Sequence, residues 1–185
     1  RTGGVALAWT GITEKPMSDF TPLQALGPLA PADLSGHDLE RYLGHYGLAP
    51  LLAEHVGLYV GYLEAGDFRL CTQVWSPAVP IGTAFVVHGY FDHLGLYRHL
   101  LECLLARGWR VVLWDLPGHG LSSGRRASID DFKDYGNCLH RLQQHLEREG
   151  LAPRPWLGVG QSTGAAILAT DALTRGDDGT WSGLA

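Results

Sequence analysis

Three short runs of apolar residues place the strongest constraint on how this chain of 185 residues can fold. Each run is continuous rather than alternating, and each is followed by glycine or charged residues. A continuous apolar run of this length is typical of a β-strand buried on both faces, as in a parallel sheet. The three predicted strands are TAFVVHG at 83–89, WRVVLWDL at 109–116 and PWLGVG at 155–160.

Helical patterns separate these strands. A leucine stripe with helical spacing covers residues 96–107. A second helix is predicted to open at Ser128, with Asp131 as its capping-box partner, and to end at Gly150. A third helix is predicted to begin at Ser162. Strands that alternate with helices in this way predict an α/β fold with a mostly parallel sheet.

The segment before the first buried strand predicts a β-hairpin. Two runs rich in β-forming residues, at 56–63 and 68–75, flank a short turn that contains Gly66. The hairpin and the strand–helix repeats together predict one domain over residues 51–185, the N-terminal part of an α/β domain.

The first 50 residues are expected to form an arm rather than a domain. Residues 1–50 contain a proline- and alanine-rich stretch, and a short helix is expected within residues 37–47. The chain does not start with methionine, and its single methionine is Met17. Two interpretations are therefore open: residues 1–16 are real coding sequence of a chain whose beginning is missing, or they are upstream sequence attached by a misplaced start, which we favour.

Polar and glycine-rich motifs follow all three buried strands. They lie at 88–89, 115–122 and 160–164. In an open α/β sheet the carboxyl ends of the parallel strands border one crevice, where ligands bind. The three motifs are therefore expected to form a single site.

The last of these motifs is Gly160-Gln161-Ser162-Thr163-Gly164, a Gly-x-Ser-x-Gly sequence between a predicted strand and a predicted helix. A serine nucleophile on such an elbow sits in a tight turn, and the two glycines relieve crowding on either side of it. The N–H groups at the start of the helix can stabilise a developing oxyanion. The alternative is that Ser162 only caps the helix and has no chemical role.

The other two motifs carry a resemblance to a known family. HGYFDHLGLY, at 88–97, fits His-Gly-x-x-Glu/Asp-His-x-x-x-Tyr, and DLPGHGLSSGRR, at 115–126, fits Asp-x-x-Gly-His-Gly-x-Ser-x-Gly-x-Arg. With the serine elbow, the chain from about 56 to 175 resembles the α/β-hydrolase fold. Within this fold, the chain most resembles the branch that contains monoacylglycerol lipases and bacterial lysophospholipases. The expected fold class is thus an α/β-hydrolase fold with a mostly parallel sheet and an N-terminal β-hairpin, incomplete at the C-terminus.

The resemblance implies a role for each matching residue. Ser162 would be the nucleophile, the backbone N–H groups of Tyr90 and Thr163 would bind the oxyanion, and Gly160 and Gly164 would be the elbow glycines. Residues expected to support the loops around the site are His88, Gly89, Asp92, His93, Asp115, Gly118, Gly120 and Arg126.

The implied activity is hydrolysis of monoacylglycerol- or lysophospholipid-like carboxylic esters through an acyl-serine intermediate. Neither a cofactor nor a metal is implied, and the expected partner is a small lipid or ester. Action on small esters or on thioesters is also consistent with the resemblance.

The sequence supplies no histidine after the predicted nucleophile, Ser162. In this fold the triad follows the chain order Ser, acid, His, so the triad acid and histidine are not expected in this sequence. Upstream, His119 is expected to be structural. We therefore expect an inactive N-terminal part of a longer enzyme, in which the strand at 155–160 forms an exposed edge and Ile167 and Leu168 are poorly covered.

Composition argues against several other classes of protein. A net charge of −5 at pH 7 gives no support for nucleic-acid binding. Three widely spaced cysteines fit neither a zinc knuckle nor a disulfide framework, which favours a reducing compartment. No apolar run approaches the length of a membrane span. The expected location is the cytoplasm, with peripheral contact with a membrane as a further expectation.

Two further functions stay open from the sequence. GVGQSTG, at 158–164, resembles a dinucleotide-binding loop, but its glycine spacing is one residue too long and it follows the fifth predicted strand rather than the first. A non-catalytic binding module with the same fold would keep all three motifs.

Overall fold

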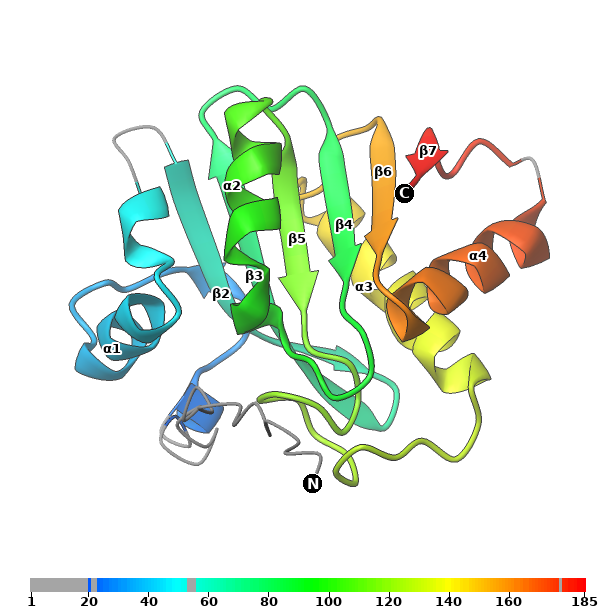
Figure 1. Cartoon of the computed structure of the whole chain (residues 1–185), viewed down its shortest axis with the longest axis horizontal. Coiled ribbons are helices and arrows are strands. Elements are labelled where there is room, and N and C mark those ends of the chain that lie inside the picture. The colour runs from blue at the N-terminus through cyan, green and yellow to red at the C-terminus, as the bar shows by residue number, and fades with distance from the viewer. Residues whose placement is uncertain (1–19, 21–22, 53–55, 177) are drawn as a thin grey trace, which may run out of the picture.

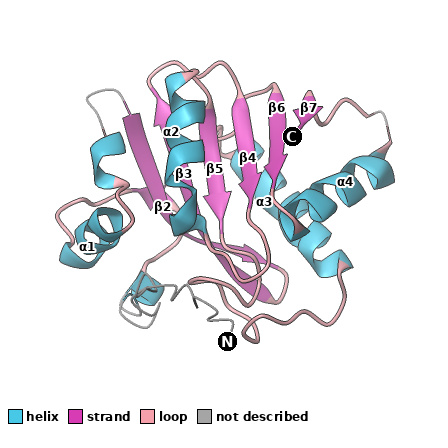
Figure 2. Ribbon diagram, viewed as in Figure 1, coloured by secondary structure: helices cyan, strands magenta, loops and turns pink. Residues whose placement is uncertain are grey.

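A single mixed sheet forms the centre of the chain, with helices on both of its faces (Figures 1 and 2). The computed structural model describes residues 20, 23–52, 56–176 and 178–185. The expectation about residues 1–16 therefore lies outside the described residues. The strands are β1 (Ala30–Pro31), β2 (Val56–Ala65), β3 (Phe68–Pro77), β4 (Thr83–Val87), β5 (Arg110–Trp114), β6 (Trp156–Gly160) and β7 (Gly183–Leu184). The α-helices are α1 (His37–His45), α2 (Arg98–Ala106), α3 (Lys133–Arg148) and α4 (Thr163–Arg175), and 3₁₀ turns span Ala49–Leu51 and Leu94–Tyr97.

The sheet has an antiparallel half and a parallel half. Its strand order is β1-β2-β3-β5-β4-β6-β7. β1, β2, β3 and β5 pair antiparallel, whereas β5, β4, β6 and β7 pair parallel. The expected hairpin is β2 and β3, which pair from Val56↔Pro77 to Ala65↔Phe68. The predicted fold class is confirmed, although the parallel pairing covers only one half of the sheet.

The continuous apolar strands are explained by cover on both faces of the sheet. In β4, Ala84 and Val86 pack with residues of α1 and α2, and Phe85 and Val87 pack with residues of α3 and α4. All four side chains are buried. Because successive residues of a strand point to opposite faces, a strand between two helical layers has to be apolar throughout.

One expectation about the sheet edge was wrong. A short strand, β7, pairs parallel to β6, and the Gly160 N–H donates to the Ala185 carbonyl at 2.9 Å. This pairing covers part of the β6 edge that was expected to be bare. Ile167 and Leu168, expected to be poorly covered, are only 1% and 2% exposed, because α4 packs them into the core that it shares with α3.

The predicted start of α3 was also wrong. The helix begins at Lys133, and Ser128 lies in the preceding loop, where its hydroxyl oxygen accepts a hydrogen bond from Arg125 at 2.6 Å. Asp131 takes the capping role instead, because its carboxylate accepts the Lys133 N–H at 2.9 Å and its carbonyl accepts the Asp134 N–H at 3.0 Å.

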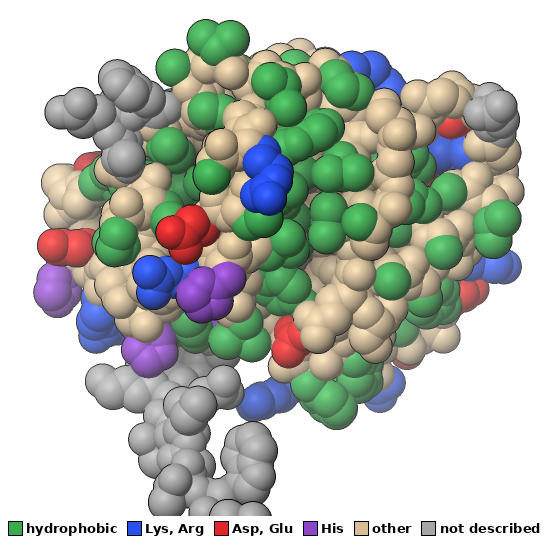
Figure 3. Space-filling view, turned by 45° about the horizontal axis from the view of Figure 1, so that its top comes forward, with side chains coloured by type: hydrophobic (Ala, Val, Ile, Leu, Met, Phe, Trp, Pro, Cys, Tyr) green, Lys and Arg blue, Asp and Glu red, His purple; other side chains and the backbone are tan. Residues whose placement is uncertain are grey.

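Apolar side chains are exposed on the face of the molecule that carries α2 (Figure 3). Val79 and Ile81, in the β3–β4 connection, are 83% and 57% exposed, and Leu184 of β7 is 45% exposed. Among the described residues, no helix combines the length and apolar character that a membrane crossing requires.

The observed start of α3 yields a prediction about stability. Asp131→Ala is expected to lower the free energy of unfolding by about 1 kcal/mol, the usual loss for a helix N-terminal cap. Ser128→Ala is the matched control and should cost clearly less, since the Ser128 hydroxyl bonds an exposed arginine. Urea denaturation of both variants measures this difference, and equal losses would contradict the assignment of the cap.

Candidate active site

The predicted site lies where β4, β5 and β6 end, at the lower edge of the sheet in Figure 1. The parallel register aligns Val87 of β4 with Trp114 of β5 and with Gly160 of β6. The loops that follow these three strands therefore start side by side, as the sequence motifs predicted.

Ser162 occupies a sharp turn between β6 and α4. Its backbone has φ 51° and ψ −112°, so this residue lies at positive φ without being a glycine. Such a conformation is sparsely populated and is concentrated at functional sites. A Cβ atom at Gly164 would overlap with the carbonyl oxygens of Val87 and His88, and one at Gly160 would overlap with the first turn of α4. Both glycines are therefore required by close approach of the backbone.

The groups expected to carry chemistry are free of partners within the described part of the chain. Ser162 is exposed, and its hydroxyl forms no hydrogen bond with any described residue. The backbone N–H groups of Tyr90 and Thr163 likewise have no acceptor among the described residues. The His-Gly loop adjoins the elbow, since a Cβ at Gly89 would lie 3.6 Å from the Ser162 Cβ.

His88 braces the loops through both ring nitrogens. Nε2 accepts the Leu116 N–H at 2.9 Å, and Nδ1 lies 2.7 Å from the Gly89 carbonyl oxygen, which selects the Nδ1–H tautomer. Burial lowers the pKa of His88 to about 4, so the ring is neutral at pH 7. With both nitrogens engaged, His88 has no free nitrogen with which to activate a serine.

A side-chain bridge joins the His-Gly loop to the elbow. The Tyr97 hydroxyl accepts the Gly89 N–H at 3.1 Å and lies 3.1 Å from Asp92 Oδ2. The same hydroxyl bonds Gln161 Oε1, and Gln161 directly precedes Ser162. Tyr97 belongs to the motif at 88–97, whereas no sequence pattern pointed to Gln161, because its contact depends on tertiary structure.

His93 caps the 3₁₀ turn that follows the His-Gly loop. Its Nδ1 accepts the Gly95 N–H at 3.2 Å, and burial lowers the pKa of the ring to about 4. His93 is therefore neutral at pH 7 and placed to hold local backbone.

Asp115 is fully buried at the end of β5 and connects two loops. Oδ1 accepts the Leu94 N–H and Oδ2 accepts the Leu121 N–H, both at 2.8 Å. Burial raises the pKa of this carboxyl group to about 7, although both N–H bonds act to lower it. A Cβ at Gly120 would overlap with the carboxylate, so the close approach of this loop requires glycine.

The remaining predicted loop residues differ in their contacts. Gly118 donates its N–H to the Ser123 carbonyl and accepts the Ala127 N–H. His119 is 5% exposed, and its Nε2 has no hydrogen-bond partner among the described residues. Arg126 is exposed and forms no hydrogen bond or ion pair with any described residue, so the structure gives it no bracing contact.

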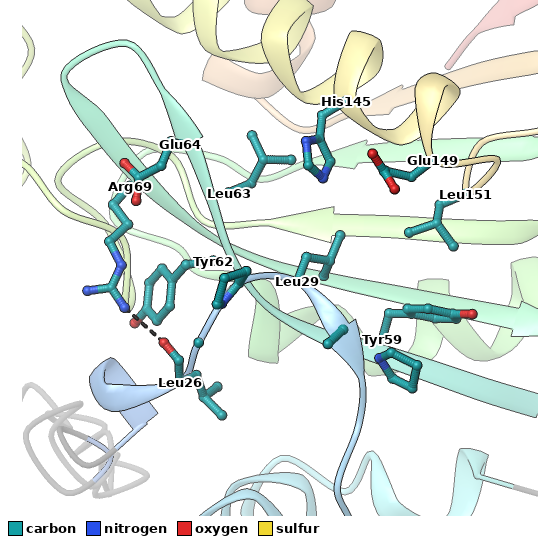
Figure 4. A pocket seen from close by; sticks show the side chains of 14 residues that line it. Leu26, Leu29, Tyr59, Tyr62, Leu63, Glu64, Arg69, His145, Glu149 and Leu151 are labelled. Atoms are coloured by element: carbon teal, nitrogen blue, oxygen red, sulfur yellow. Dashed lines mark hydrogen bonds between the residues drawn. The ribbon is translucent and has the colours of Figure 1, made fainter.

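A cavity of about 260 Å³ lies directly against the elbow, with largely apolar walls. Its lining residues are Leu96, Tyr97, His99, Leu100, Val159, Gly160 and Gln161. A larger hollow of about 670 Å³ lies elsewhere, between the arm, β2 and the C-terminal end of α3 (Figure 4). Its lining includes none of the predicted site residues, so this hollow is not part of the site around Ser162, although it is the larger of the two. No group of three metal-ligating side chains is found among the described residues.

Comparison with known proteins identifies the family. A family model described as "Serine aminopeptidase, S33" matches residues 78–185, more than half of the chain. The chain belongs to this family. The serine aminopeptidase S33 match covers all three motifs of the site and the strands that carry them.

Individual relatives agree with this family membership. The chain is 35% identical over 108 residues to a monoacylglycerol lipase of Mycolicibacterium smegmatis, covering 58% of this chain and 38% of that protein. It is 33% identical over 93 residues to the phospholipase YtpA of Bacillus subtilis, covering 50% of this chain and 35% of that protein. The chain thus spans little more than a third of the length of these relatives.

Solved structures show the same fold. A lipase described as putative, from Acinetobacter baumannii, superimposes with a TM-score of 0.58 at 18% identity, over 94% of this chain and 47% of that one. At this level of identity the likeness is one of fold, and it confirms the α/β-hydrolase architecture.

The burial of Asp115 predicts a pH dependence of stability. The pKa of this group is about 7 in the folded chain and 3.8 when unperturbed, so the folded state retains the proton between these values. The contribution of Asp115 to stability is therefore fully present below about pH 4 and is lost as the pH rises to about 7. Urea denaturation of the wild type and of Asp115→Asn at pH 5 and pH 7.5 measures how this contribution changes with pH.

At pH 5 the variant should be less stable by about 1–3 kcal/mol, because one N–H of Leu94 or Leu121 loses its acceptor. That deficit should shrink as the pH rises, since only the wild type loses the Asp115 contribution. His88 and His93 are present in both proteins, so their opposite pH dependence cancels in the difference. A deficit that is independent of pH would contradict the raised pKa.

Proposed function

We propose that this chain carries the nucleophile and the oxyanion-binding groups of a serine hydrolase that acts on carboxylic esters. The observation that supports this most strongly is the elbow itself. Ser162 is held at positive φ with an unpartnered hydroxyl, on a turn that adjoins the loop of Tyr90. A serine that only capped a helix would accept a backbone N–H of α4 with its side-chain oxygen, and the Ser162 side chain forms no such bond.

The proposed reaction passes through an acyl-enzyme. Ser162 Oγ attacks the ester carbonyl, and the negative charge that develops on the carbonyl oxygen is stabilised by the N–H groups of Tyr90 and Thr163. The proposed external base takes the Ser162 proton and gives it to the alcohol as the tetrahedral intermediate expels that group, and water then hydrolyses the acyl-serine, which releases the acid and restores the serine hydroxyl. Each oxyanion donor contributes about 3 kcal/mol in enzymes of this type.

The triad acid and base are proposed to be supplied from outside these 185 residues. No described histidine or carboxylate bonds the Ser162 hydroxyl. His88 belongs to the His-Gly motif beside the elbow, and both of its ring nitrogens are hydrogen-bonded to backbone groups. A serine hydroxyl without a base is a weak nucleophile at neutral pH, so the 185 residues alone should be inactive.

The proposed substrate class is a monoacylglycerol- or lysophospholipid-like ester. The names of the relatives support this class, since they include a monoacylglycerol lipase and a phospholipase. The apolar side chains of Leu96, Leu100 and Val159 beside the elbow also favour a substrate with an aliphatic part. A cytoplasmic location with peripheral contact at a membrane completes the proposal.

The assignment of the nucleophile can be tested in the protein that carries this sequence together with its acid and base. Ser162→Ala is expected to reduce hydrolysis of a p-nitrophenyl ester by at least about 1,000-fold and to remove labelling by a fluorophosphonate. The matched control is Ser35→Ala, at an exposed serine in the arm, which should retain full activity.

Full activity in Ser162→Ala would contradict the assignment.

The 185 residues alone provide a second test. Turnover by this chain that is lost in Ser162→Ala would place the base among its own histidines and contradict the proposed external base.

The oxyanion donors can be tested by separating backbone from side chain. Tyr90→Pro deletes the proposed N–H donor at a turn position that accepts proline, and it should reduce kcat by about 100-fold or more. Tyr90→Phe keeps the N–H and removes only the hydroxyl that donates to the Ala127 carbonyl, so its kcat should stay within a few-fold of the wild type. Equal losses in both variants would remove Tyr90 N–H from the mechanism.

A further inference from the structure

The turn that carries the Tyr90 N–H has an unusual residue at its third position. The Asp92 N–H donates to the Gly89 carbonyl at 3.2 Å, which closes a four-residue turn, and Phe91 has φ 66°. Turns with positive φ at this position normally take glycine or asparagine there. A bulky aromatic residue in this conformation is a genuine outlier.

Stability does not account for the choice of phenylalanine. A left-handed backbone is unfavourable for a residue with a Cβ atom. Phe91 is also 78% exposed, so burial of its ring gives little in return. Its described ring contact is with Tyr90, with centroids 4.5 Å apart, and Tyr90 is itself 41% exposed. Glycine at position 91 would remove the strain.

The position of Phe91 relates it to the site. Gly89, two residues earlier, lies against Ser162. The intervening Tyr90 is fixed by its hydroxyl bond to the Ala127 carbonyl and by ring contact with His119 at 5.2 Å. Phe91 is thus an exposed aromatic ring on a braced turn beside the proposed nucleophile.

We propose that Phe91 is a specificity-determining residue whose ring contacts the acyl chain of the ester bound at Ser162. The proposal rests on the proposed function, because it takes the ester as the ligand. An acyl chain is favoured over a lipid surface because the exposed apolar groups on this turn are only two rings, Tyr90 and Phe91. This area suits the side of an aliphatic chain, whereas membrane docking requires a broader apolar face.

The test uses binding, so it needs no turnover, and it is made with the protein that carries this sequence together with its acid and base. The probes are two non-hydrolysable ethers, 1-O-hexadecylglycerol below its micelle concentration and 1-O-butylglycerol, with calorimetry as the readout. Phe91→Gly is expected to weaken binding of the hexadecyl ether by about 10-fold and to leave the butyl ether unchanged. The same variant should raise Tm by about 2–4 °C through relief of strain.

Matched variants separate the ring from the turn. Phe91→Asn tolerates the left-handed backbone but is polar, so it should lose the same hexadecyl affinity. Phe91→Leu keeps an apolar side chain and should retain most of it. Leu173→Ala, which removes an 84% exposed apolar side chain on α4, should change neither affinity.

Any one of the following results would overturn the proposal. They are unchanged hexadecyl affinity in Phe91→Gly, equal losses for both ethers, and a loss confined to binding of phosphatidylcholine vesicles, which would make Phe91 a membrane-docking residue. Absence of hexadecyl binding in the wild type would also overturn it. Failure of the proposed function has a separate signature, namely hydrolysis that survives in Ser162→Ala.

Discussion

The buried carboxylate of Asp115 holds together two of the loops from which the candidate site is built. Its two oxygens accept the N–H groups of Leu94 and Leu121, which belong to the loops after β4 and β5. The Asp115 carbonyl also accepts the Ser122 hydroxyl at 2.7 Å. Because a buried N–H without an acceptor is costly, these loops cannot shift independently of the end of β5.

The third loop is held against the others by close backbone approach. Gly164 brings the start of α4 onto the carbonyl groups of Val87 and His88, and the Gln161 N–H donates to the Val87 carbonyl at 3.1 Å. The side chains around the elbow therefore act mainly on backbone position. This is the arrangement that oxyanion stabilisation requires, since main-chain donors are useful only if they are already in place when charge develops. His88 fits this arrangement, because it is neutral and both of its ring nitrogens are hydrogen-bonded to the backbone, so it braces the site and is not available as a base.

Local sequence patterns predicted the strands and the elbow, but not the features that depend on distant contacts. Continuous apolar runs located β4, β5 and β6, because burial on both faces leaves no room for alternation. β7 was not predicted, because a strand of two residues is too short to show a periodic pattern. The Ser128 pattern suggested a helix start that the structure uses as a loop, with Asp131 capping instead. The contact of Gln161 with Tyr97 joins residues 64 positions apart, and the left-handed backbone of Phe91 contradicts the usual preference of that residue.

We propose that Ser162 and two main-chain N–H groups form one preorganised catalytic unit. The most direct test is a crystal structure of the protein, with its acid and base present, after reaction with a fluorophosphonate. We expect a phosphonyl group on Ser162 Oγ, with one phosphoryl oxygen about 2.7–3.1 Å from the backbone nitrogens of both Tyr90 and Thr163. A phosphonyl group on another residue, or an oxygen on Ser162 that bonds neither nitrogen, would contradict it.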